Sequence, residues 1–173
     1  GTPVHIASLD VSDCFHRFRI PKFFSEYFCL PPIQAGSVGL EHVDGVPVGP
    51  LDKVWPRMAI LPMGCSWSLY FAQAAVSSIV NRFLGCMEVL SVIGALLLHD
   101  WAHCFYVDNV GIIGTDRAAV SKALHAARRI LDGCGLLTHE SEEPSTRAAV
   151  LGIELDGIQL SCRIGDKKFW KLE

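Results

Sequence analysis

The chain has 173 residues, of which 50% are hydrophobic and 19% are charged, and this composition excludes an intrinsically disordered segment. It supplies enough apolar material for one domain with a sizeable core. The formal net charge is −3 with the histidines neutral, so no overall positive field indicates a nucleic-acid partner. The longest apolar run, 89–98, is too short to cross a bilayer, and we expect no membrane partner.

The cysteines indicate a cellular compartment. There are seven, an odd number, and none forms a Cys-x-x-Cys pair. Most lie among apolar neighbours, as Cys86 and Cys104 do, which predicts core thiols in a reduced, intracellular protein of the cytoplasm or nucleus. The chain begins with Gly1 and a strand-like run follows almost at once, so we expect it to be part of a longer protein.

The first third of the chain predicts one strand followed by irregular structure. Residues 4–11 form a buried strand that ends in a polar turn at Ser12-Asp13. Residues 14–30 are rich in aromatic side chains and are interrupted by proline, which indicates a short helix or strand and then a turn. The glycines and prolines of 33–60 predict hairpins, loops and short strands.

The pattern of the remaining residues predicts three helices and two hairpins. Apolar residues recur at helical spacing after Pro62-Met63-Gly64, where Ser66 or Ser68 is a candidate helix cap. The first predicted helix runs from there to Phe83, and a second covers 86–98. Strands at 103–108 and 110–114 follow, with Asp108-Asn109 at the hairpin tip. A helix at 116–132 begins at Thr115 or Asp116 and is stopped by Gly133 and Gly135, and strands at 148–155 and 158–163 are joined around Asp156-Gly157.

With the irregular insert set aside, this order is close to strand-helix-strand-strand-helix-strand. That is a split βαβ arrangement, so the predicted fold class is α+β, with a ferredoxin-like antiparallel sheet packed on helices.

Two carboxylates stand at positions that do not serve a core. Asp10 ends a hydrophobic strand, and Asp108 lies at the tip of a hydrophobic hairpin. If these strands are neighbours, both side chains project from the same edge of the sheet. Adjacent carboxylates repel each other unless a cation lies between them, and Mg²⁺ prefers such oxygen ligands. A pair of metal ions can activate an attacking hydroxyl and stabilise a leaving pyrophosphate.

Four segments in order resemble the motifs of reverse transcriptases from retrotransposons and retroviruses. They are Asp10 with Asp13 and Phe15, Leu-Pro-x-Gly at 61–64, Tyr-x-Asp-x at 106–109, and the run 150–155, which resembles the primer-grip hairpin. The resemblance covers about residues 4–160 and is closest to retrotransposons with long terminal repeats or a tyrosine recombinase.

The resemblance implies a single polymerase palm with part of the fingers across 1–173. In this description the fingers-like insert is about 16–61, the primer-grip-like hairpin is about 148–163, and the thumb starts at 164–173. The implied reaction is RNA-directed DNA synthesis, in which a primer 3′-hydroxyl attacks a deoxynucleoside triphosphate. The implied partners are an RNA or DNA template with its primer strand, deoxynucleoside triphosphates and the remainder of a polyprotein.

The resemblance also implies a role for each residue that matches a motif. Asp10 and Asp108 would bind two Mg²⁺ ions, or Mn²⁺ in their place, together with the carbonyl of Val11. Phe15 would stand where a bulky ring collides with a ribose 2′-hydroxyl, which favours deoxynucleotides. The remaining implied contacts are with the incoming nucleotide, by Val11, Asp13, Cys14, Met63 and Gly64, and with the primer, by Tyr106, Leu151 and Gly152.

The last member of the implied catalytic set departs from the family. The hairpin usually reads Tyr-x-Asp-Asp, and here the final residue is Asn109, which keeps one oxygen acceptor but carries no charge. An alternative is therefore a catalytically decayed relative that binds nucleic acid or protein only. Another palm-fold enzyme, such as a nucleotide cyclase, is a further alternative, although it predicts a glycine-rich turn that the hairpin lacks.

Each motif also has a purely structural interpretation. Asp10 and Asp13 are compatible with turn residues that cap a helix near Cys14, and Asp108-Asn109 with a plain hairpin tip. The 61–64 segment is compatible with an ordinary loop before a helix, and Phe15 and Tyr106 with core aromatics. A structural α/β module would need none of these residues for chemistry, but it leaves the polar hairpin tip opposite Asp10 unexplained.

A zinc site is a weaker hypothesis. His99 and His103 lie four residues apart, which suits two ligands on one helix face. The residues between them lack the glutamate of a metalloprotease motif, and no third ligand follows.

Overall fold

The computed structural model describes residues 2–84 and 101–165 and divides into two compact units. The first unit comprises Gly1–Cys14 and Leu69–Glu173, and the second comprises Phe15–Ser68. The helix predicted at 86–98, His99 of the zinc hypothesis and most of the segment predicted as a thumb lie outside the described residues.

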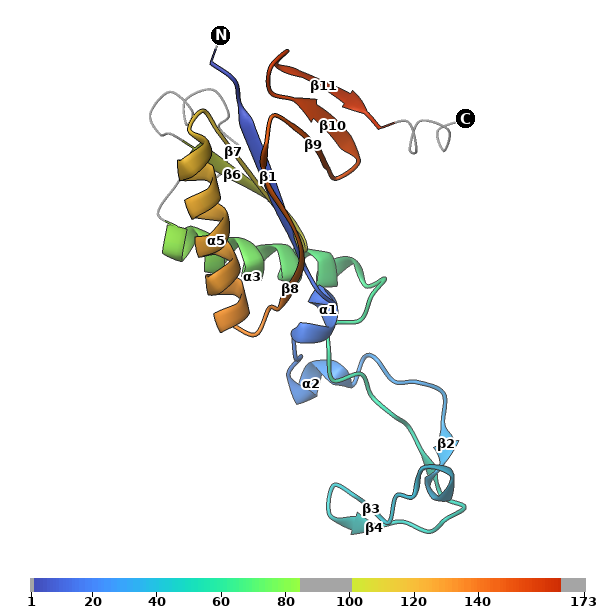
Figure 1. Ribbon diagram of the computed structural model, residues 1–173. Coiled ribbons are helices and arrows are strands. Elements are labelled where there is room, and N and C mark those ends of the chain that lie inside the picture. The colour runs from blue at the N-terminus through green and yellow to red at the C-terminus, as the bar shows by residue number, and fades with distance from the viewer. Residues whose placement is uncertain (1, 85–100, 166–173) are drawn as a thin grey trace. The chain divides into compact units, whose positions relative to one another are not determined.

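A four-stranded antiparallel sheet forms the centre of the first unit (Figure 1). Its strand order is β6-β7-β1-β8. Among the described residues, the long helices α3 and α5 lie in the connections from β1 to β6 and from β7 to β8. The chain order β1-α3-β6-β7-α5-β8 is the predicted split βαβ arrangement, so the fold class is confirmed. The bounds are β1 His5–Val11, α3 Ser66–Leu84, β6 Trp101–Tyr106, β7 Asn109–Gly114, α5 Arg117–Gly133 and β8 Thr138–Ser145.

The core lies between this sheet and α5, which packs on β1, β7 and β8. The side chains of Leu9 and Ile112 are almost fully buried on the sheet, and those of Leu124 and Leu131 on the helix. Helix α5 begins as predicted, because the Asp116 side chain accepts a hydrogen bond from the N–H of Ala118. The apolar residues that recur at helical spacing in α5 include Val120, Leu124 and Leu131, which are buried, so the periodicity identified the face that packs on the sheet.

The fourth strand of this sheet was not predicted. The sequence places it within 148–155, whereas the structure places it at β8, which reads Thr-His-Glu-Ser-Glu-Glu-Pro-Ser. Strand β8 is at the edge of the sheet, and only Pro144 among its residues is buried. An edge strand with mostly solvated side chains lacks the apolar alternation that identifies strands in a sequence.

The predicted strand at 148–155 is two strands of a separate three-stranded sheet. Strands β9 (Arg147–Val150), β10 (Ile153–Asp156) and β11 (Ser161–Ile164) pair in sequence order. Leu151 and Gly152 form the turn between β9 and β10, with φ of 55° and 78°. Two successive positive φ angles are typical of a two-residue hairpin turn whose twist matches the strands.

The hairpin that carries Asp108 is shifted by one residue from the prediction. Val107 and Asp108 form the turn, while Asn109 is the first residue of β7 and pairs with Tyr106. Asn109 also pairs with Asp10 of β1, so it has a strand neighbour on each side and belongs to the sheet rather than to the turn.

The second unit contains short elements, as the glycines and prolines predict. They are α2 (Lys22–Ser25), β2 (Ile33–Gln34) paired with β5 (Lys53–Val54), a 3₁₀ turn at Ala35–Val38, and β3 (His42–Val43) paired with β4 (Val46–Pro47). Helix α1 (Cys14–Arg17) begins at the last residue of the first unit.

The prediction of buried thiols is largely wrong. Among the six described cysteines only Cys14 is buried, and Cys104 is exposed although it lies on β6, a strand of the main sheet. Successive side chains of a strand point to opposite faces, and Cys104 alternates with the buried His103 and Phe105.

No helix in the two described stretches of the chain is both long enough and apolar enough to cross a membrane.

A buried histidine connects α3 to β6 and predicts a pH dependence of stability. His103 is fully buried, and its Nε2 lies 2.8 Å from Oδ1 of Asn81. Burial lowers the pKa of His103 below its ordinary value of 6.5, so the unfolded chain binds the proton more tightly. This contribution to stability is complete above about pH 6.5 and declines as the pH falls from there toward the folded-state pKa.

We therefore expect the urea midpoint of the wild type to fall more between about pH 7.5 and about pH 5.5 than that of His103→Gln, which does not titrate. Equal falls in the two proteins would contradict this assignment.

Candidate metal centre

Asp10 lies on the central strand β1 with a polar neighbour on each side. In the antiparallel pairing it faces Asn109 of β7 and Glu140 of β8. Strand β1 alternates buried and partly exposed side chains over Leu9, Asp10 and Val11, and Asp10 falls on the partly exposed side. The same pleat that buries Leu9 and Val11 therefore presents the carboxylate of Asp10 outside the core.

Asp108 is attached to the end of β1 through its backbone. The N–H of Val11 donates to the carbonyl of Asp108 at 2.9 Å. The side chain of Asn109 also approaches Asp108, and its Nδ2 donates to Oδ1 of Asp108 at 2.9 Å. The structure thus brings together three predicted residues, Asp10, Val11 and Asp108, with Asn109 beside them.

The electrostatics at this end of the sheet reflect clustered negative charge. Burial raises the pKa of Asp10, the charge of Asp108 raises it further, and Glu140 adds to the effect, while His139 opposes it. Burial also raises the pKa of the Cys14 thiol to about 11, with smaller contributions from Asp108 and Asp10. A cation near Asp10 would reverse these effects, because it favours the ionised carboxylates.

The residues at this position fit a divalent cation. Oδ1 of Asp10 is buried and makes no hydrogen bond within the described part of the chain. One ligand atom from each of Asp10, His139 and Glu140 lies within 4.8 Å of the others. Carboxylate oxygens are the ligands that Mg²⁺ and Mn²⁺ prefer, and a carboxylate oxygen without a donor has its lone pairs available.

Sequence reasoning missed His139 and Glu140. Both lie on β8, the strand that the sequence did not predict, so nothing placed them beside Asp10. The one available signal was the run Glu140-Ser141-Glu142, in which two acids two residues apart fall on one face if the segment is a strand.

The other predicted site residues are distributed over both units. Asp13 is exposed at φ 51° and Cys14 is buried at the start of α1. Tyr106 is 54% exposed at the end of β6, and Leu151 and Gly152 form the β9–β10 turn. Within the second unit, Phe15 is half-buried, Met63 is exposed, and Gly64 has a φ of 90°. Their roles in nucleotide and primer binding stay predictions.

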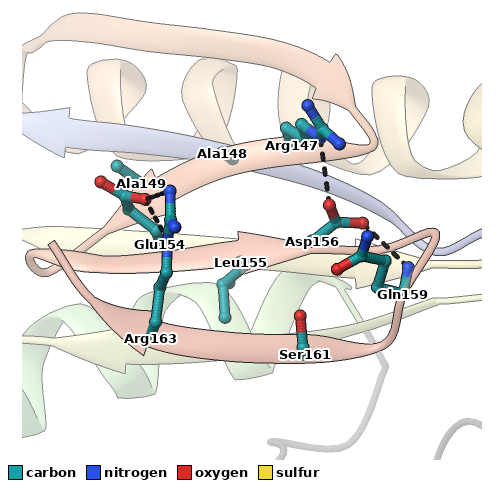
Figure 2. A pocket seen from close by; sticks show the side chains of 9 residues that line it. All are labelled: Arg147, Ala148, Ala149, Glu154, Leu155, Asp156, Gln159, Ser161 and Arg163. Atoms are coloured by element: carbon teal, nitrogen blue, oxygen red, sulfur yellow. Dashed lines mark hydrogen bonds and ion pairs between the residues drawn. The ribbon is translucent and has the colours of Figure 1, made fainter.

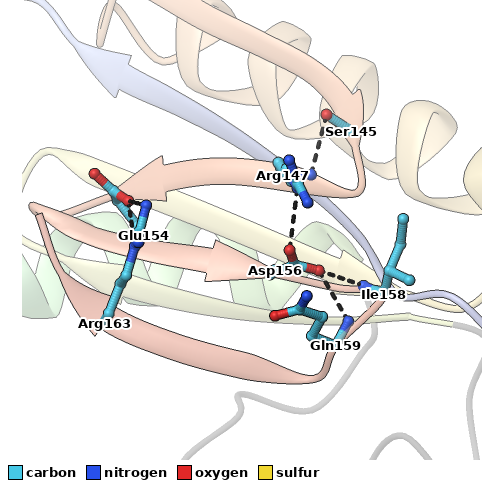
Figure 3. Close-up of polar contacts among 7 residues, drawn as sticks. All are labelled: Ser145, Arg147, Glu154, Asp156, Ile158, Gln159 and Arg163. Atoms are coloured by element: carbon cyan, nitrogen blue, oxygen red, sulfur yellow. Dashed lines mark hydrogen bonds and ion pairs between the residues drawn. The ribbon is translucent and has the colours of Figure 1, made fainter.

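The three-stranded sheet β9–β11 carries a separate polar cavity of about 620 Å³ (Figure 2). Arg147 donates to Asp156 at 3.0 Å and Arg163 donates to Glu154 at 2.7 Å, so each guanidinium faces a carboxylate across adjacent strands (Figure 3). Asp156 also accepts from the N–H groups of Gln159 and Ile158, and the bond from Gln159 contributes most to lowering the pKa of Asp156. These pairs leave the cavity lining with balanced charge.

A solved structure has a fold similar to that of this chain. The chain is similar to an apo telomerase from Candida tropicalis truncated from its C-terminal domain, with a TM-score of 0.57 and 13% sequence identity. The likeness covers 93% of this chain and 35% of that chain. This chain therefore spans about a third of the length of the telomerase structure that it matches, and at this identity the likeness shows a palm-like α+β fold.

No protein-family model matches the sequence. No curated protein matches it.

The proximity of the carboxylates predicts how the titration of Asp10 responds to substitution. Asp108→Asn should lower the pKa of Asp10 because it removes a neighbouring negative charge, and Glu140→Gln should lower it less, because Asp108 contributes more than Glu140. Carboxyl-carbon NMR measures the titration of Asp10 directly.

The matched control is Glu143→Gln. Glu143 is on the same strand as Glu140, but its carboxylate lies 3.6 Å from His125 and should not influence Asp10. An Asp10 titration that is unchanged in Asp108→Asn would contradict the described geometry.

Proposed function

We propose that this chain is the palm-centred part of an RNA-directed DNA polymerase from a retroelement. The observation that carries the proposal is the proximity of Asp10 and Asp108 at one end of the central sheet. The Val11–Asp108 backbone hydrogen bond fixes this arrangement, and the charge of Asp108 acts on the carboxyl of Asp10. Neither carboxylate contributes to the core, and a shared cation would offset the repulsion that their proximity creates.

Two further observations support the proposal. The motifs around Asp10, Gly64 and Asp108 occur in the order of the reverse transcriptase family. One solved structure of similar fold is a telomerase. The proposed retroelement type, with long terminal repeats or a tyrosine recombinase, is supported by the sequence motifs alone.

In this proposal Asp10, Asp108 and the carbonyl of Val11 hold two Mg²⁺ ions, or Mn²⁺ in their place. When bound, the ions supply activation of the primer 3′-hydroxyl and charge neutralisation at the triphosphate. Asn109 orients Asp108 through its amide, and Tyr106 contacts the primer end. The partners are a primed RNA or DNA template and deoxynucleoside triphosphates, and the protein acts inside the cell as part of a polyprotein.

One contact favours a second candidate, a decayed relative that binds nucleic acid or protein without catalysis. The amide of Asn109 donates to Oδ1 of Asp108 and thereby occupies a lone pair that a metal ion would use. An aspartate at this position would accept rather than donate and would add a negative charge.

Primer extension on an RNA template distinguishes these functions. It should be measured in the longest natural form of the protein for the wild type, Asp10→Asn and Asn109→Asp. The polymerase proposal predicts extension by the wild type and a loss of about a hundredfold or more in Asp10→Asn, a cost of about 2.7 kcal/mol in transition-state stabilisation. The decayed relative predicts no extension by the wild type and a gain of extension in Asn109→Asp.

Asp116→Asn is the matched control for the charge change. Asparagine caps helices as well as aspartate does, so this variant should keep its stability and extend the primer at the wild-type rate. Extension that is equal in the wild type and in Asp10→Asn would contradict a metal role for Asp10.

A further inference from the structure

We propose that Gln73 of α3 is a positioning residue that holds the Asp108 turn in its metal-binding geometry. This inference rests on the proposed function. Oε1 of Gln73 accepts from the N–H of Val107 at 2.6 Å, and Nε2 donates to the carbonyl of Phe105 at 3.3 Å. Gln73 therefore bonds to the backbone on both sides of Tyr106, directly before Asp108.

The side-chain amide of Gln73 takes the place of a neighbouring strand. Among the strands that the structure describes, β6 is at the edge of the sheet, and no described strand pairs with the backbone groups on its outer side. The carbonyl of one residue and the N–H of the residue two positions later are the groups that a residue of a parallel strand would join. One glutamine amide, with one donor and one acceptor used, satisfies both.

This pairing matters because Val107 adopts an unfavourable backbone conformation. Its φ is 58°, in the left-handed region that β-branched residues rarely occupy. Such a conformation persists only where surrounding contacts impose it. The side chain of Val107 is buried, and Gln73 holds its N–H, so the two restraints act on one residue.

The restraints continue through the turn to the metal centre. Val107 is held from α3 by Gln73, and the next residue, Asp108, is held from β1 by the N–H of Val11. The turn is thus held by hydrogen bonds from two different elements, which restrain the backbone of Asp108 relative to Asp10. Gln73 acts through this backbone, so its loss should loosen Asp108 while leaving every proposed metal ligand in the chain.

Backbone hydrogen exchange tests the clamp without any enzymatic assay. Gln73→Met keeps the length and helix propensity of the side chain but removes both hydrogen bonds. We expect the N–H of Val107 to exchange at least about tenfold faster in this variant, because it loses its acceptor. Gln73→Asn, whose shorter side chain cannot make both bonds, is a milder variant in which the same N–H should also exchange faster.

Asn81→Leu is the matched control. Asn81 is the other α3 amide that contacts β6, and it contacts the His103 ring rather than the turn. This variant should lower global stability but leave the exchange of Val107 unchanged relative to its neighbours. Unchanged Val107 exchange in Gln73→Met, or the same acceleration in Asn81→Leu, would overturn the inference.

The Mg²⁺ dependence of primer extension tests the functional consequence. Gln73→Met should raise the Mg²⁺ concentration for half-maximal extension several-fold, and should raise it less in a Val107→Gly background, because glycine adopts a positive φ freely. An equal increase in both backgrounds would contradict the role of Val107. If the wild type extends no primer and Asp10→Asn changes nothing measurable, the proposed function fails, while Val107 exchange still decides whether Gln73 holds the turn.

Discussion

The placement of the Asp10 carboxylate, partly buried and close to the charge of Asp108, is the constraint on which the rest of this end of the sheet depends. Folding brings these groups together even though burial and mutual charge both raise the pKa of Asp10. Two hydrogen bonds hold the turn: the backbone N–H of Val11 donates to the carbonyl of Asp108, and the backbone N–H of Val107 donates to the side chain of Gln73. Two nearby carboxylates repel each other, and this repulsion brings no packing gain. A cation bound between them would attract both carboxylates and so offset the repulsion.

The central position of β1 explains how one strand serves both the core and the site. Its side chains alternate, so Leu9 and Val11 are buried while Asp10 lies on the opposite side. Pairing on both edges gives Asp10 two cross-strand neighbours, Asn109 and Glu140. The neighbour on β7, Asn109, is uncharged, and the neighbour on β8, Glu140, carries a carboxylate. With Asp108, three acidic side chains therefore act on this end of the sheet.

Sequence patterns predicted the elements whose packing leaves a periodic signal. Helix α5 and strands β1 and β7 have apolar residues at the spacing of their buried faces, so the sequence predicted these elements and, from their order, the fold class of the chain. Strand β8 was missed because an edge strand can be polar on nearly every residue. His139 and Glu140 were missed with it, and so was Gln73, whose role depends on a contact 34 residues away along the chain. Pairing across a sheet and bonds to a distant turn leave no local pattern.

We propose that Asp10 and Asp108 share a divalent cation, and paramagnetic broadening by Mn²⁺ is the most direct test of this proposal. Backbone amide signals would be followed as Mn²⁺ is added to the chain and to its Asp10→Asn variant. If they share a cation, the signals of Asp10, Val11, Asp108 and Glu140 should broaden first in the wild type, and the same broadening should require a much higher Mn²⁺ concentration in Asp10→Asn. Broadening that begins elsewhere, for instance around Glu154 and Asp156, or that is unaffected by Asp10→Asn, would contradict it.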